Sequence, residues 1–168
     1  MAQENIFNFS NRMEPSKAQS LEEQTEQLRG LYNFLNDKSF NGCLLPMPII
    51  TAVPHGLSDS KCWMAYCDVQ NVEGVERRYK IYLCVDDFNR DVLAVSQALI
   101  YQMIHLFNVY RGILDCTPYG YHNEHFKVAA EAHGMMVTEH PIYGYSPTGL
   151  HPQMIEDLIN AGIERFAL

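Results

Sequence analysis

Residues 91–110 read Asp-Val-Leu-Ala-Val-Ser-Gln-Ala-Leu-Ile-Tyr-Gln-Met-Ile-His-Leu-Phe-Asn-Val-Tyr. Apolar side chains recur along this stretch at three- and four-residue steps, at Val92, Val95, Leu99, Met103, Leu106 and Tyr110. Such spacing is typical of a helix that buries one face. We therefore predict a long helix from about Asp91 to Tyr110, which Arg111-Gly112 ends.

The residues before this helix predict one further helix and three strands. Ser20 and Glu23 form a capping box, and the apolar side chains that follow share one helical face, at Leu21, Leu28, Leu31, Tyr32 and Leu35. This helix should end near Phe40-Asn41-Gly42. Strands are predicted at residues 49–53, 62–70 and 78–85, and residues 71–76 are predicted to be the hairpin turn between the last two.

The residues after the long helix predict loops and two short helices. A loop is expected at residues 113–121, a helix at 123–133, a segment rich in glycine, proline and aromatic residues at 141–149, and a last helix at 152–161. This order favours an α+β domain, with one small three-stranded sheet covered by helices on one face. Residues 1–18 are expected to be a flexible segment, and residues 19–168 to form a single domain.

Composition narrows the classes of function. The chain has 20 acidic and 12 basic residues, for a formal net charge of −8, so non-specific binding to DNA is not expected. The five cysteines are scattered without any C-x-x-C pair, which favours reduced, buried thiols. No run approaches the roughly 18 apolar residues that span a bilayer. We therefore expect a soluble, cytoplasmic protein without a membrane partner.

The chemistry-bearing residues of the long helix are Tyr101, Gln102 and His105. Residues four apart in a helix share a face, and zinc metallopeptidases carry His-Glu-x-x-His at this spacing, with two metal ligands and a general base. Here tyrosine stands at the first histidine and glutamine at the glutamate. A glutamine side chain has no basic site that could accept a proton from water.

Three segments together resemble the SprT-like family, whose zincin fold is shared by bacterial SprT proteins and the Spartan DNA–protein crosslink proteases. The first is residues 40–46, Phe-Asn-Gly-Cys-Leu-Leu-Pro. The second is residues 98–108 of the long helix. The third is His122-Asn123-Glu124-His125-Phe126, which opens a helix ending at His133-Gly134. They occur in the family's order between Leu31 and about Ile159.

The resemblance implies a zincin-like fold in which His105 and His122 are the surviving, vestigial metal ligands. Tyr101 then stands at the first ligand position and Gln102 at the general base. A catalytically inactive pseudo-metallopeptidase without a bound cofactor is expected, acting as a protein-binding module. Members that lack an appended zinc ribbon resemble those of phages and mobile elements. This implies an inhibitor of a basic, nucleic-acid-handling host protein, such as an anti-CRISPR protein.

Several alternatives remain open at the level of sequence. A zinc-dependent peptidase could use an atypical site of Tyr101, His105 and His122, with zinc as its cofactor, and a DNA-directed function could be inherited from the Spartan-like relatives. Tyr101 could instead fill the volume of a lost metal, and His105 could be a hydrogen-bonded core histidine. His125 could complete a three-histidine site. The remaining histidines are interpreted as surface or turn residues: His55, His133, His140 and His151. The tyrosines of residues 119–121 and 143–145 could form a binding rim, or they could anchor loops.

Overall fold

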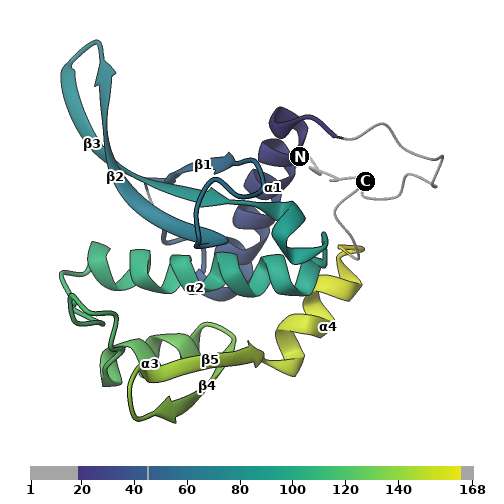
Figure 1. Ribbon diagram of the computed structural model, residues 1–168, viewed down its shortest axis with the longest axis vertical. Coiled ribbons are helices and arrows are strands. Elements are labelled where there is room, and N and C mark those ends of the chain that lie inside the picture. The colour runs from purple at the N-terminus through teal and green to yellow at the C-terminus, as the bar shows by residue number, and fades with distance from the viewer. Residues whose placement is uncertain (1–18, 45, 164–168) are drawn as a thin grey trace.

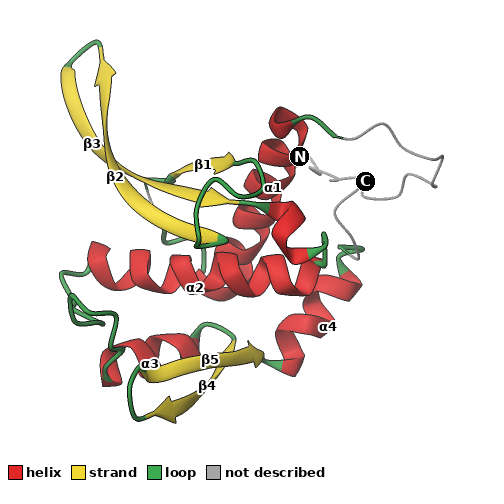
Figure 2. Cartoon of the chain, viewed as in Figure 1, coloured by secondary structure: helices red, strands yellow, loops and turns green. Residues whose placement is uncertain are grey.

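The computed structural model describes residues 19–44 and 46–163. In order along the chain, its elements are α1 (Leu21–Phe40), β1 (Ile49–Ala52), β2 (Cys62–Asn71), β3 (Gly74–Leu83), the 3₁₀ helix η1 (Val85–Phe88), α2 (Val92–Tyr110), α3 (Glu124–Ala132), β4 (Met135–His140), β5 (Gly144–Leu150) and α4 (Pro152–Asn160). The predicted α+β class is confirmed (Figures 1 and 2). The expected flexible segment, residues 1–18, lies outside the described residues.

The larger sheet has three strands in the order β1-β3-β2, with β1 parallel and β2 antiparallel to β3. Its inward face carries the fully buried Ile50, Ile81 and Leu83. These side chains belong to one core with α1 and α2, which contribute Leu28, Leu31, Leu99 and Met103, among others. The sheet therefore has helices on one face, as expected (Figure 1).

Helix α1 follows its sequence signals closely. The capping box of Ser20 and Glu23 is formed, and the helix ends at Asn41, which is left-handed with φ 51°. Leu21 is the exception to the predicted face, because it is exposed. It lies in the first turn, before the helix meets the sheet.

The β2–β3 hairpin is longer than predicted. We expected residues 71–76 to form the turn and the second strand to begin at Arg78, but β3 begins at Gly74 and pairs directly with Asn71. Pairing continues toward the tip because Tyr66 packs on Tyr79 and Asp68 forms an ion pair with Arg77 across the strands. Such cross-strand pairs stabilise a ladder. The hairpin therefore extends away from the body of the protein as a two-stranded arm (Figure 1).

A second sheet of two antiparallel strands, β4 and β5, was not predicted. No strand was predicted at residues 141–149, where Pro147 and Gly149 are poor strand formers. The pairing is irregular, with a register shift between Met136 and Val137, and a bulge of this kind accommodates such residues. Tertiary packing therefore overrides the local sequence signal here.

Helix α2 (Val92–Tyr110) lies between the two sheets (Figures 1 and 2). By length and composition alone, α2 is long and apolar enough to cross a membrane, with a mean hydropathy of 1.4 in its most apolar window. However, 56% of that window is buried inside the protein. The core helix of a soluble protein has this character, and no other described helix meets the criterion.

Candidate functional site

The predicted site residues come together between α2 and the segment before α3. Helix α2 places Tyr101 and His105 on one face, and their ring centroids lie 4.7 Å apart. The ring of His122 lies 5.5 Å from that of Tyr101 and 5.3 Å from that of His105. The three positions that the family resemblance assigns to metal ligands therefore form one cluster.

The backbone of His122 is fixed by β5 and the preceding turn. Its N–H donates to the carbonyl of Tyr143 (2.9 Å), and its carbonyl accepts from the N–H of Tyr145 (3.1 Å). Gly144, between these two residues, is left-handed at φ 69°. A Cβ atom at Gly144 would lie 2.0 Å from the backbone oxygen of His122, so glycine is the residue that allows this crossing.

A hydrogen bond of 2.8 Å joins the hydroxyl of Tyr101 to Nε2 of His122. Burial, aided by Cys116 and Asp115, raises the pKa of Tyr101 to about 12, so the phenol is neutral. Burial and the neighbouring His105 lower the pKa of His122, against the opposing effects of Asp115 and the backbone of Tyr145. The imidazole is only 8% exposed, and its Nδ1 has no hydrogen-bond partner among the described residues.

Gln102 points away from this cluster. Its side chain is buried, at 7% exposed, and its Nε2 donates to the carbonyl of Cys62 on β2 over 3.4 Å. The Gln102 side chain is therefore hydrogen-bonded to the larger sheet. The amide cannot accept a proton from water, so this position supplies no general base.

His105 is paired with a carboxylate that the sequence reasoning did not identify. Its Nδ1 lies 2.8 Å from Oδ2 of Asp115, and Nδ2 of Asn108 donates to the same oxygen over 2.9 Å. Burial raises the pKa of Asp115, but the hydrogen bonds and charge of His105, helped by Asn108 and Cys116, hold it below its ordinary value. A carboxylate commonly orients a metal-binding histidine in this way, which is the signal that could have drawn attention to Asp115.

Among residues 19–44 and 46–163, two groups of side chains place metal-ligating atoms within 4.8 Å of one another. One is His105, Asp115 and Cys116 in the cluster, and the other is His55, Cys84 and Asp87, near η1. The cluster of Tyr101, His105 and His122 does not reproduce the zinc ligands of His-Glu-x-x-His. The Tyr101 phenol is neutral and bonded to the His122 nitrogen that would ligate, and no carboxylate stands at Gln102.

His125 does not join the cluster, as one alternative required. It lies in the exposed first turn of α3, and its neighbour Phe126 takes the inward position. The ring centroid of Phe126 lies 4.2 Å from that of His122 and 5.2 Å from that of His105. An apolar ring therefore closes the site where a third histidine was considered.

The other histidines and the tyrosine rim lie in different surroundings. His133 lies in the turn that ends α3, as predicted, but it is half-buried and its ring stacks on that of Phe40 with centroids 4.2 Å apart. His55, His140 and His151 lie at the surface or in turns. Of the two tyrosine-rich segments, Tyr119, Tyr121 and Tyr143 are exposed, whereas Tyr145 donates to Glu124 over 3.2 Å.

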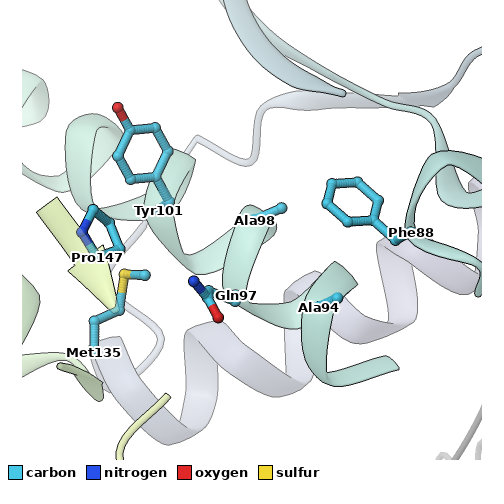
Figure 3. A pocket seen from close by; sticks show the side chains of 7 residues that line it. All are labelled: Phe88, Ala94, Gln97, Ala98, Tyr101, Met135 and Pro147. Atoms are coloured by element: carbon cyan, nitrogen blue, oxygen red, sulfur yellow. The ribbon is translucent and has the colours of Figure 1, made fainter. Parts of the chain in front are cut away.

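An apolar pocket of about 220 Å³ lies beside the cluster (Figure 3). Helix α2 contributes one wall, and β4, β5 and η1 the rest, through Phe88, Ala94, Gln97, Ala98, Tyr101, Met135 and Pro147. Tyr101 thus lines the pocket with its ring while its hydroxyl meets His122. A space of this size can hold one large apolar side chain.

No protein family matches the chain, and neither does a curated protein or a solved structure.

Proposed function

We propose that this cytoplasmic protein is a zincin-like pseudo-metallopeptidase that has lost hydrolysis and acts by binding another protein. The observation that carries the proposal is the 2.8 Å hydrogen bond between Tyr101 and His122. It joins the residues that stand at two of the family's ligand positions, so the phenol takes the place of the metal. The resemblance of residues 31–159 to the SprT-like family supports the same conclusion.

The arrangement of Gln102 supports the loss of catalysis independently. Removal of a general base typically lowers a rate by around 10² to 10⁴. Here the amide is both unable to accept a proton and held against β2 by its bond to Cys62. Substrate hydrolysis therefore lacks the general base that would activate water.

The chemistry around the site favours a basic protein as partner. The C-terminal lobe (residues 113–163) carries a single base, Lys127, against six acidic residues, Asp115, Glu124, Glu131, Glu139, Glu156 and Asp157. Exposed aromatic rings at Tyr119 and Tyr143 lie on the same lobe. Carboxylates and aromatic rings both bind arginine and lysine side chains. We therefore propose a nucleic-acid-handling host protein as target, inhibited in the manner of an anti-CRISPR protein.

Restoring the missing ligand and base tests the proposal directly. In the wild-type protein, the zinc content after purification should not change on His122→Ala. The double variant Tyr101→His/Gln102→Glu should gain one equivalent of zinc, and His122→Ala in that background should remove it. Peptidase activity in the wild-type protein that disappears on His105→Ala would overturn the proposal.

The pairing of His105 with Asp115 favours a second candidate function, a zinc-dependent peptidase with an atypical site. A carboxylate-oriented imidazole is a feature of working metal sites. In that case hydrolysis of an unfolded substrate such as casein should require zinc, and Asp115→Asn should reduce it. The matched control is Glu156→Gln, at an exposed position of α4.

A further inference from the structure

A second cluster of metal-ligating side chains lies away from the candidate site, where β1 and β2 connect to the start of α2. His55 comes from the loop after β1, and Cys84 and Asp87 come from the turn at η1. One ligand atom from each lies within 4.8 Å of the other two. The proposed function uses none of these residues, so a role for them is independent of it.

The local backbone explains why Cys84 and Asp87 face the same way. Cys84 is the N-cap of η1 and Asp87 lies three residues later. Because a 3₁₀ helix has three residues per turn, side chains at this spacing eclipse one another. The N–H of Cys84 also donates to the carbonyl of Lys61 over 3.0 Å, which fixes the turn against the beginning of β2.

Two of the three groups are shielded from solvent, and the third is accessible. Cys84 is 3% exposed and the side chain of Asp87 is 11% exposed, whereas the side chain of His55 is 80% exposed. The imidazole Nδ1 is hydrogen-bonded to the Asp87 carboxylate. A cation could therefore reach the buried thiol and carboxylate from the side on which His55 lies.

The backbone of Asp87 is held by a group outside the cluster. The ammonium of Lys61 donates to the backbone carbonyl of Asp87 over 2.8 Å. That bond therefore leaves the carboxylate oxygens to the imidazole and the thiol.

We propose that His55, Cys84 and Asp87 form a Zn²⁺ site. Sulfur, imidazole nitrogen and carboxylate oxygen are the donors that zinc takes in proteins, and three protein ligands leave the fourth tetrahedral position to water. Thiolate sulfur disfavours magnesium and calcium. As the zinc–sulfur bond forms, the proton of the Cys84 thiol passes to solvent, and the hydrogen bond between His55 and Asp87 is replaced by two bonds to the ion.

The consequence for the molecule is a link between two segments that are far apart in sequence. The ion joins the loop after β1 to the turn that carries Phe88, and Phe88 lines the apolar pocket. Zinc binding therefore stabilises the folded state and fixes one wall of that pocket. It leaves the hydrogen bond between Tyr101 and His122 unchanged.

Titration of the metal-free protein with zinc chloride, followed by calorimetry, tests the site. One equivalent should bind, with release of a proton that is seen as a dependence of the heat on buffer ionisation. Cobalt(II) should give a thiolate-to-metal absorption band. Cys84→Ser should remove that band and weaken zinc binding by more than about 100-fold, beyond the effect typical of outer-shell changes.

Two further variants keep the test decisive. His55→Ala, at an exposed position that does not disturb the core, should also weaken zinc binding, even if Cys84→Ser fails to fold. Cys116→Ser, in the other cluster, should bind zinc as the wild-type protein does. The proposal is overturned if His55→Ala leaves affinity unchanged, if Cys116→Ser abolishes the cobalt band, or if no zinc binds.

Discussion

At the scale of single residues, the site is a closed polar cluster within an apolar shell. The Tyr101 hydroxyl satisfies one nitrogen of His122, while Asp115 satisfies one nitrogen of His105. The other ring nitrogen of His122, Nδ1, is buried without a partner among the described residues. A buried polar group without a partner costs about 1 to 3 kcal/mol of stability. The hydrogen bond from His122 to Tyr101 is therefore important for keeping this imidazole buried.

Removing the Tyr101 hydroxyl should therefore destabilise the protein. Tyr101→Phe keeps the ring and leaves both nitrogens of His122 unpaired, and we expect the free energy of unfolding to fall by about 1 to 3 kcal/mol. Urea denaturation followed by circular dichroism measures this. Tyr119→Phe, at a side chain that is 97% exposed, is the control and should change nothing. Equal stability of the two variants would contradict the role assigned to Tyr101.

The pH dependence of stability should report on His122. Its pKa is lowered by burial and by His105, so the unfolded chain binds more protons than the folded one as pH falls below the ordinary histidine value of 6.5. The free energy of unfolding should then decrease from about pH 6.5 downward. His133, whose pKa is also lowered by burial, contributes in the same direction.

Substitution separates the two histidine contributions. His122→Gln should flatten part of the dependence between about pH 7 and pH 5, and His133→Gln should flatten the rest. Urea denaturation across this range at constant ionic strength is the measurement. A dependence that persists unchanged in the double variant would rule out both assignments.

At the scale of elements, local signals predicted α1 and α2 well and the C-terminal strands poorly. Capping at Ser20 and the regular apolar spacing of α2 are local and strong. Strands β4 and β5 contain Pro147 and Gly149 and a register shift, and they are stabilised by packing on α2 and α3. The resemblance to the SprT-like family placed Tyr101 and His122 at ligand positions of one site, and it is the reason that we expected them to lie close together. Asp115 could not be placed, because only the folded chain brings its loop back to α2.

The crossing of β5 and the His122 segment gives the sharpest element-scale prediction. Gly144→Ala places a methyl group 2.0 Å from the His122 oxygen and also strains φ, which alone costs about 1 to 2 kcal/mol. We expect Gly144→Ala to lower the free energy of unfolding by clearly more than the cost of the strained φ alone. Gly120→Ala is the matched control, because its φ of 81° is similar but no atom lies within 4 Å of the added carbon. Similar melting temperatures for the two variants would disprove the steric account.

At the scale of the whole molecule, the structure divides into a well-packed centre and a projecting arm. Helix α2 is buried between the two sheets (Figure 1), whereas the residues of β2 and β3 beyond Tyr66 and Tyr79 are mostly exposed. Regions with few buried contacts open at low free energy. The free energy of local opening should therefore be lower at the tip of the β2–β3 hairpin than in its part near the core.

Amide hydrogen exchange tests this unevenness. Backbone amides of Ile81 and Leu83, next to the core, should exchange only through global unfolding, while those near Val75 exchange by local opening. Mass spectrometry of pepsin fragments resolves the two regions. Adding denaturant should accelerate the first group and leave the second nearly unaffected. Uniform protection along β3 would mean that the arm is held by contacts beyond its own strands.

Because glycine has no side chain, its presence at position 144 can help to identify related proteins that keep this backbone crossing. Any chain in which two backbones meet this closely must keep glycine there, whatever has become of its tyrosine, glutamine or imidazoles. A newly sequenced chain that shares the glycine but bears a larger group at 122 would still have inherited the same junction. In a related protein without this glycine, the backbone of the segment must follow a different path.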